Sequence, residues 1–204
     1  MFRQNYSLKG NWNKQFFQNN NPIVLELGCG KGEYTTGLAR NFPGKNFIGI
    51  DIKGARIWKG AKEVHDEQIK NAGFLRTRID LAESFFDTNE VSEIWITFPD
   101  PQPKKARKRL SSPIFLNRYK KILDPRGLIH LKTDSLELYD YTLETLNYNH
   151  CEILLNTKDL YAQPLAEDFL AIKTYYESQF LKLGKPITYI RFRLADKEIE
   201  DVPE

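Results

Sequence analysis

The chain has little of what builds a metal centre or a disulfide framework. Its 204 residues include only 2 cysteines, Cys29 and Cys151, and 3 histidines. Neither cysteine stands at a metal-ligand spacing from the other or from a histidine, so we expect no metal site and no disulfide. A reducing cytoplasm is the compartment that this cysteine usage favours.

Long apolar runs are also missing. No stretch approaches the roughly 20 apolar residues that span a bilayer, and residues 1–21 lack the apolar run of a secretory signal. We therefore expect no membrane contact. Net charge is only +3, so a nucleic-acid site would have to be a local basic patch on an otherwise balanced surface.

What the chain does have is enough apolar material for one core. Hydrophobic residues make up 41% of it, with 13 Phe, 10 Tyr and 3 Trp, and this length suits a single domain. We expect that domain to occupy residues 22–195. Residues 1–21 are predicted to be a flexible polar segment, and residues 196–204 a disordered acidic tail with too few apolar side chains to dock. Nothing in the pattern requires a protein partner.

Short apolar runs alternate with helical patterns along the chain. The expected strands are residues 23–27, 46–50, 74–79, 93–98, 128–132, 152–155 and 187–194. The expected helices are residues 34–41, 55–71, 136–146 and 169–181, with one more between Ser112-Pro113 and residues 124–127. This alternation predicts an α/β, doubly wound, mostly parallel sheet with helices on both faces and an antiparallel edge strand. Trp58 and Trp95 are expected in the core.

Three alternating glycines follow the first expected strand, in Gly28-Cys29-Gly30-Lys31-Gly32. Glycine lets the backbone approach a ligand closely, and the helix that follows offers free N–H groups. Glycine turns of this kind are common, but Asp51 ends the next strand, where a carboxylate can accept from both ribose hydroxyls of an adenosine cofactor. Asp80, after the third strand, is placed either to accept from an adenine amino group or to cap a helix.

The residue before the loop discriminates between cofactors. A nicotinamide cofactor prefers the spacing G-x-G-x-x-G and places a pyrophosphate over the helix. Glu26 would repel a pyrophosphate, whereas it suits a ligand that carries an ammonium and a sulfonium. The cofactor predicted at Glu26, Gly28, Gly30 and Asp51 is therefore S-adenosylmethionine.

A proline-braced acid follows the fourth expected strand, in Phe98-Pro99-Asp100-Pro101-Gln102-Pro103. Prolines alone indicate a stiff surface turn, but they do not explain an acid held between two of them. Five cations follow it directly: Lys104, Lys105, Arg107, Lys108 and Arg109. A charge run is more often a solvated loop, yet beside Asp100 it favours phosphate contacts.

These residues resemble the bacterial tRNA (guanine-N7-)-methyltransferase family. The resemblance is carried by Phe98-Pro99-Asp100-Pro101 with Lys104, by Glu26 to Gly32, Asp51 and Asp80, by Lys132-Thr133-Asp134, and by Thr174-Tyr175-Tyr176-Glu177. It implies a seven-stranded Rossmann-like methyltransferase sheet, and it implies methylation of the variable-loop guanosine of tRNA with S-adenosylmethionine and no metal. The chain departs from the usual family pattern at Gln102, Asp51 and Tyr175, and its basic run is shorter.

The resemblance also implies a role for each matching residue. The residues implied to contact S-adenosylmethionine are Glu26, Asp51, Asp80 and Asp100, with Asp100 also catalytic, beside Gly28 and Gly30 of the loop predicted above. The residues implied to bind the tRNA are Lys104, Asp134, Thr174, Tyr175, Tyr176 and Glu177. Adjacent helical residues point roughly 100° apart, so we expect one of the two tyrosines to face the substrate and the other to pack inward.

Guanine N7 carries a lone pair and no proton, so its methylation needs positioning rather than a general base. We predict that Asp100 and Asp134 accept from the guanine N1–H and amine. Two other functions remain open. One is a methyltransferase of exocyclic amines, which usually shows Asn or Asp before Pro-Pro and an aromatic residue; the other is a non-catalytic RNA-binding protein on the same scaffold.

Overall fold

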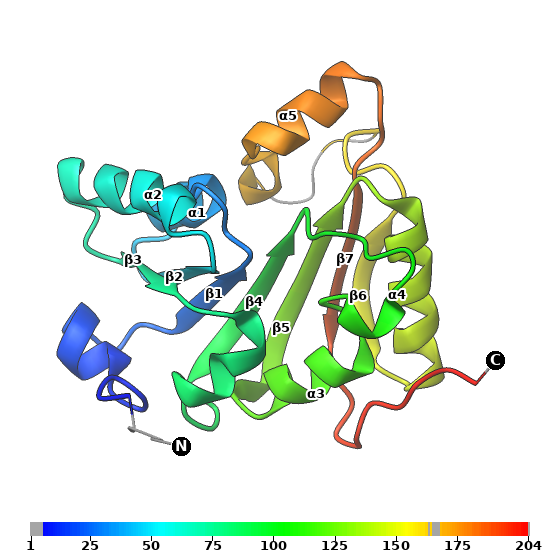
Figure 1. Cartoon of the computed structure of the whole chain (residues 1–204), viewed down its shortest axis with the longest axis horizontal. Helices are drawn as coiled ribbons and strands as arrows, with labels where there is room; N and C mark the ends of the chain where they lie inside the picture. The colour runs from blue at the N-terminus through cyan, green and yellow to red at the C-terminus, as the bar shows by residue number, and fades with distance from the viewer. Residues whose placement is uncertain (1–5, 163, 165–167, 204) are drawn as a thin grey trace.

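A seven-stranded sheet runs through the computed structural model, which describes residues 6–162, 164 and 168–203 (Figure 1). The strands are β1 (Ile23–Leu27), β2 (Asn46–Asp51), β3 (Ala72–Arg76), β4 (Val91–Thr97), β5 (Leu123–Thr133), β6 (Glu152–Thr157) and β7 (Thr188–Arg193). Their order across the sheet is β3-β2-β1-β4-β5-β7-β6. The pairs among β1 to β5 are parallel, and β7 pairs antiparallel with β5 and with β6. The predicted fold class is confirmed, with the antiparallel pair at one edge.

Helices cover both faces of this sheet. The α-helices are α1 (Glu33–Asn41), α2 (Gly54–Asp66), α3 (Pro113–Lys120), α4 (Leu136–Tyr148) and α5 (Tyr175–Lys182). The shorter turns are the π-helix η1 (Trp12–Phe17) and the 3-10 helices η2 (Ile79–Ser84), η3 (Ala106–Lys108) and η4 (Asp168–Ala171). In Figure 1, α5 stands above the ends of β4 and β5, apart from the helices that pack on the sheet. No helix in the described part of the chain is long and apolar enough to cross a membrane.

Successive strand residues point to opposite faces, so the sheet divides the core in two. Leu25 and Leu27 belong to one apolar cluster, with Leu116 of α3 and Leu138 of α4. The other cluster contains Val24, Tyr34, Leu38, Trp95 and Tyr189, which places α1 on the opposite face. Each fully buried side chain of this kind contributes roughly 1.5–3 kcal/mol to folding. Apolar residues at successive positions of β1 are therefore required by burial on both faces.

Some expectations about the core and the elements are wrong: the helix expected over residues 169–181 is divided into η4 and α5, and the strand expected over residues 74–79 is β3, which ends at Arg76. Residues 124–127 do not close a helix, because α3 ends at Lys120 and β5 begins at Leu123, with a register shift opposite it in β4. Trp58 is 64% exposed on α2, since Ile57 and Gly60 supply the buried side of that helix. Trp95 is buried, as expected.

Both ends of the described chain pack against the domain. We expected a flexible segment before residue 22, but Trp12 is buried, stacks on Phe86 with ring centroids 5.4 Å apart, and donates to the Phe85 carbonyl oxygen at 2.9 Å. We expected a tail unable to dock, but Ile199 is buried and its backbone makes two hydrogen bonds with the Asn117 side chain. A few apolar residues suffice because side-chain amides satisfy the adjoining backbone. The division of the chain at residues 21 and 195 stays a prediction.

Candidate active site

The glycine loop leaves its backbone open above the end of β1. Gly28 and Gly30 have φ of 81° and 55°, and a Cβ at either position would meet nothing within 4 Å. These glycines are therefore required by backbone conformation rather than by packing. The Gly30 N–H donates to Asp51 Oδ2 at 3.0 Å, and the other carboxylate oxygen of Asp51 accepts from Lys53 N at 2.8 Å. The loop and the end of β2 thus hold each other in place.

Glu26, the predicted ammonium partner, is a buried carboxyl. It is 3% exposed and accepts from Thr35 N at 2.8 Å, from the Thr35 hydroxyl and from the Thr97 hydroxyl at 2.7 Å. Burial raises the pKa of Glu26 to about 7, although the hydrogen bonds from Thr35 and Thr97 act in the opposite direction. A cation placed beside this carboxyl would favour its ionised form and would be bound in return.

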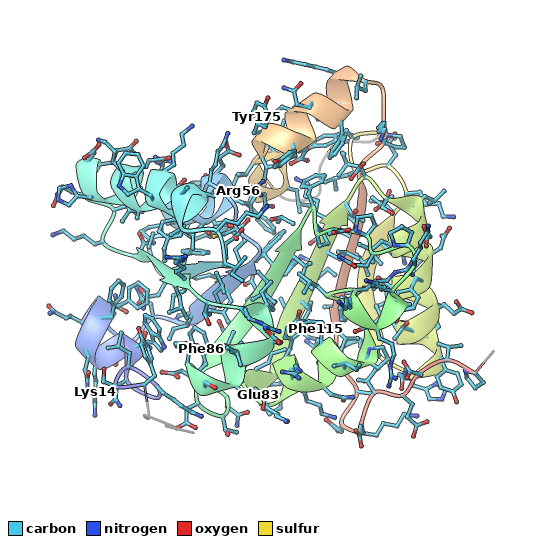
Figure 2. The ribbon with its side chains drawn as sticks, in the orientation of Figure 1. Lys14, Arg56, Glu83, Phe86, Phe115 and Tyr175 are labelled. Carbon is cyan, nitrogen blue, oxygen red and sulfur yellow. The ribbon has the colours of Figure 1, made fainter. Side chains whose placement is uncertain are left out.

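Two hollows meet at Gly28. The inner hollow is lined by Glu26, Gly28, Cys29, Gly30, Lys31, Glu33, Arg56, Thr97, Phe98, Thr174, Tyr175 and Tyr176. The outer hollow is lined by Gly28, Asp51, Ile52, Thr77, Arg78, Ile79, Asp80, Gln102, Lys108, Leu110 and Phe115. Figure 2 labels Arg56 of α2 and Tyr175 of α5, which line the inner hollow, and Phe115 of α3, which lines the outer one.

The outer hollow combines carboxylates with an apolar wall. Asp51 and Asp80 lie in it beside Ile52, Ile79 and Phe115. An adenosine needs such a site, with acceptors for its hydroxyls and amino group and apolar side chains against its ring. Asp80 was predicted either to accept from adenine or to cap a helix. It does not cap η2, because the N-cap of that helix is Arg78.

Asp80 is also tied to that capping residue. The Arg78 guanidinium donates to both carboxylate oxygens of Asp80, at 2.9 and 2.6 Å, and lowers the pKa of Asp80. Asp80 is therefore ionised at neutral pH, and both of its oxygens act only as acceptors.

The proline-braced acid Asp100 stands between Phe98, which lines the inner hollow, and Gln102, which lines the outer one, but it is not itself among the lining residues of either. Asp100 is exposed and accepts from the Gln102 backbone N at 3.1 Å and from its side-chain amide at 2.8 Å. Phe98 and Gln102 adopt left-handed φ of 47° and 46°, which non-glycine residues rarely do and which costs of order 1–3 kcal/mol each. The strained turn thus aims Asp100 outward, and its contacts with cofactor and guanine stay predictions.

The basic segment is divided between surface and interior. Lys104, Lys105, Arg107 and Lys108 are exposed, as phosphate contacts require. Arg109 is buried, pairs with Glu137, donates to the Pro101 carbonyl oxygen at 3.0 Å and stacks on Tyr141. The prediction that Arg109 meets phosphate is therefore corrected: its guanidinium anchors the loop to α4.

The segment Thr174–Glu177 begins α5 and contributes to the inner hollow. Thr174 is the N-cap, and its side chain accepts from Glu177 N in a capping box. Tyr175 and Tyr176 are 52% and 49% exposed and both line the hollow, so the expectation that one packs inward is wrong. Glu177 takes the buried side of the first turn of α5, which leaves both rings on its open side.

Glu177 does not face the hollow. Its side chain is fully buried and pairs with Lys132 Nζ at 2.7 Å, so the predicted substrate contact is corrected. Asp134, the residue directly after the end of β5, is half-buried, and its Oδ2 lies 3.6 Å from Lys185 Nζ. The fold places Asp134 at the same sheet edge as the hollows, but it is not among the residues that line them.

Sequence reasoning missed several lining residues. Lys31 lies 4.7 Å from the centroid of the Tyr175 ring, and Glu33 accepts from Tyr175 N at 2.7 Å. Arg56 enters the inner hollow from α2. Thr97, which directly precedes Phe98 at the end of β4, could have been found by its position. Within the described residues, no group of three or more histidines, cysteines or acids could hold a metal ion.

Comparison with known protein families identifies the class as methyltransferase. The model of a family described as "Putative methyltransferase" matches residues 20–190. Among solved structures, the 16S rRNA methyltransferase KamB aligns over 89% of this chain and 92% of its own, with a TM-score of 0.67 and 13% identity. At that identity the likeness shows the fold alone.

Sequence relatives narrow the family. The tRNA (guanine-N(7)-)-methyltransferase of Bacteroides thetaiotaomicron is 53% identical over 98% of this chain and 79% of its own length. That of Christiangramia forsetii is 55% identical over 93% and 86%. The chain belongs to the tRNA (guanine-N7-)-methyltransferase family, as its motifs indicated.

Proposed function

We propose that this enzyme transfers the methyl group of S-adenosylmethionine to N7 of a guanosine in tRNA. The observation that carries the proposal is the meeting of two hollows at an open glycine loop, with a buried carboxyl in one and paired acceptors in the other. The relatives' shared activity supports the nature of the substrate. The resemblance further favours the variable-loop guanosine.

The cofactor is proposed to span both hollows. Asp51 and Asp80 in the outer hollow would accept from the ribose hydroxyls and the adenine amino group. Glu26 in the inner hollow would attract the ammonium, and the open backbone at Gly28 and Gly30 lets the chain between them approach. When bound, this cofactor supplies an electrophilic methyl group on a sulfonium.

The guanine is proposed to enter beside Asp100. Asp100 and Asp134 would accept from N1–H and the exocyclic amine, which fixes N7 toward the inner hollow. No side chain has to remove a proton, so positioning and the carboxylates' stabilisation of a cationic ring supply the acceleration.

The exposed cations Lys104, Lys105, Arg107 and Lys108 would contact tRNA phosphates. Such contacts make affinity salt-dependent and position the RNA without reading its sequence. The base has to leave its stack to reach the hollow, and Tyr175 and Tyr176 offer aromatic faces where it would arrive.

One experiment tests the proposal. The protein is incubated with labelled S-adenosylmethionine and unmodified tRNA, and the digested RNA is analysed for methylated nucleosides. We expect label in 7-methylguanosine, within the fragment that contains the variable loop. Label in methyladenine would favour an exocyclic-amine methyltransferase, and failure to bind S-adenosylmethionine in calorimetry would favour a non-catalytic RNA-binding protein.

A further inference from the structure

The first turn of α5 is attached to the sheet by a buried ion pair. Lys132 lies at the end of β5 and Glu177 in the first turn of α5, with Nζ and Oε1 2.7 Å apart and both side chains fully buried. Within α5, Glu177 is the one buried residue. The helix also has Phe180 and Leu181 partly buried against an apolar cluster, so the ion pair fixes its first turn while these apolar side chains pack its second.

Hydrogen bonds complete the network around both charges. Lys132 Nζ also donates to the carbonyl oxygens of Leu170 at 2.9 Å and Ile172 at 3.2 Å. Glu177 Oε1 accepts from the Tyr161 hydroxyl at 2.6 Å, and its Oε2 faces Thr174 N in the capping box. Burial lowers the pKa of Lys132, and the Glu177 carboxylate acts in the opposite direction. Buried charges are tolerated when they are paired and hydrogen-bonded in this way.

Neighbouring contacts link α5 and the residues after it to α1 and to the residues that follow β4 and β5. At its start, Tyr175 N donates to Glu33 of α1. Along its length, the Phe180 ring lies 5.9 Å from that of Phe98, two residues before Asp100. Just beyond its end, Lys185 faces Asp134. The position of α5 therefore affects the inner hollow and both acids proposed to hold guanine.

We propose that Lys132 and Glu177 are positioning residues, which hold α5 as a wall of the inner hollow and so place Tyr175 and Tyr176 against the ligands. This inference rests on the proposed function for the identity of those ligands. Glu177 is enclosed, and its carboxylate is occupied by Lys132, Tyr161 and the backbone, so it acts on the substrate through α5 rather than by contact.

A double-mutant cycle separates positioning from contact. The variants are Lys132→Met, Glu177→Gln and the double variant, and the measurements are the KM for tRNA, the affinity for S-adenosylhomocysteine, and hydrogen exchange of residues 175–182. Each single change leaves one buried charge unpaired. The double change removes both charges, while the glutamine oxygen can still accept from Tyr161.

We expect each single variant to raise KM and weaken cofactor binding by about tenfold, with faster exchange in α5. The double variant is expected to recover most of the loss in all three measurements, since removing both charges of a buried pair is often near neutral. If Glu177 instead touched the substrate, Lys132→Met would be close to wild type and both variants with glutamine equally impaired, which would overturn the proposal.

Glu93→Gln is the matched control for a purely structural effect. It breaks the ion pair between Lys45 and Glu93, 2.6 Å apart, and alters the contacts of Glu93 with His130 and Trp95 in the core; none of these residues lines either hollow. We expect it to lower the melting temperature and leave KM and cofactor affinity unchanged. The same behaviour in Glu177→Gln would refute the positioning role. Should the single variants not fold, impaired KM and affinity in the folded double variant would refute it as well.

The readouts also separate this inference from the proposed function. If wild-type protein methylates no tRNA, the proposed function fails, while exchange in α5 and cofactor affinity still report on the ion pair. If wild-type protein is active and the cycle shows no coupling between the two residues, the inference fails by itself.

Discussion

The two halves of the active edge are built by different kinds of interaction. At the cofactor half, backbone N–H groups hold the carboxylates: Glu26 accepts from Thr35 N, and Asp51 accepts from Gly30 N. At the substrate half, side-chain ion pairs join the segments, such as Arg109 with Glu137 and Lys132 with Glu177. The cofactor half is thus held largely through the backbone, whereas the RNA half depends on a few charged side chains.

The largest expected effect belongs to Asp100, on the turn between the two halves. Asp100→Ala should lower kcat/KM for tRNA methylation by about 100-fold or more, because it removes a carboxylate that positions guanine and stabilises the cationic product. Asp140→Ala, which removes an exposed acid of α4, is the control. If Asp100→Ala kept the turnover and the KM of the wild type, Asp100 would have no role in positioning guanine.

In the cofactor half, Glu26 should make stability depend on pH. The folded protein holds the Glu26 proton up to pH about 7, whereas an unfolded glutamate loses it near pH 4.5. The folded state thus binds more protons between these values, so this group's contribution to the free energy of unfolding falls as pH rises, by up to about 3 kcal/mol. Glu26→Gln should therefore gain stability relative to wild type between pH 5 and pH 8 in urea unfolding. A constant difference would contradict the raised pKa.

Ionisation of Glu26 should lower stability as pH rises but raise the affinity for the cofactor. An ammonium binds the ionised carboxyl, so wild-type affinity for S-adenosylmethionine should rise from pH 6 to pH 8. Glu26→Gln should weaken binding by about tenfold at pH 8 and flatten the profile, since a charge-assisted hydrogen bond is lost. Calorimetry across this range measures both, and an equally steep profile in the variant would show that another group titrates.

The smallest expected effects distinguish the buried Arg109 from the exposed Lys105 within the basic segment. Arg109→Ala should lower the free energy of unfolding by about 1–2 kcal/mol, because it removes a buried guanidinium and its partners. Lys105→Ala should change stability by less than about 0.5 kcal/mol and lower the slope of log affinity against log salt by about 1. Chemical unfolding and RNA binding at several salt concentrations test the two variants. A loss of stability in Lys105→Ala with a changed salt dependence in Arg109→Ala would contradict these roles.

The sequence predicted the cofactor half of the site better than the substrate half. β1 was predicted with its observed bounds, and Glu26, Gly28, Gly30 and Asp51 were assigned to one site, because glycine conformation and strand ends are local properties. Arg109 and Glu177 were assigned to the surface, because nothing local marks a charge whose partner lies 28 or 45 residues away. Trp58 was assigned to the core because composition alone does not say which side of α2 is covered.

By itself, the sequence determined the alternation of strands and helices, the open glycine loop, and the family to which the chain belongs. These follow from periodicity and from motifs whose residues lie within a few positions of one another. Only the tertiary structure decided that Glu177 faces Lys132, that Asp100 sits on a strained turn between two hollows, and that both tyrosines of α5 stand in the open. Those features depend on which distant segments meet. A charged side chain that is buried where they meet, such as Glu177, pairs with another residue and does not contact a ligand.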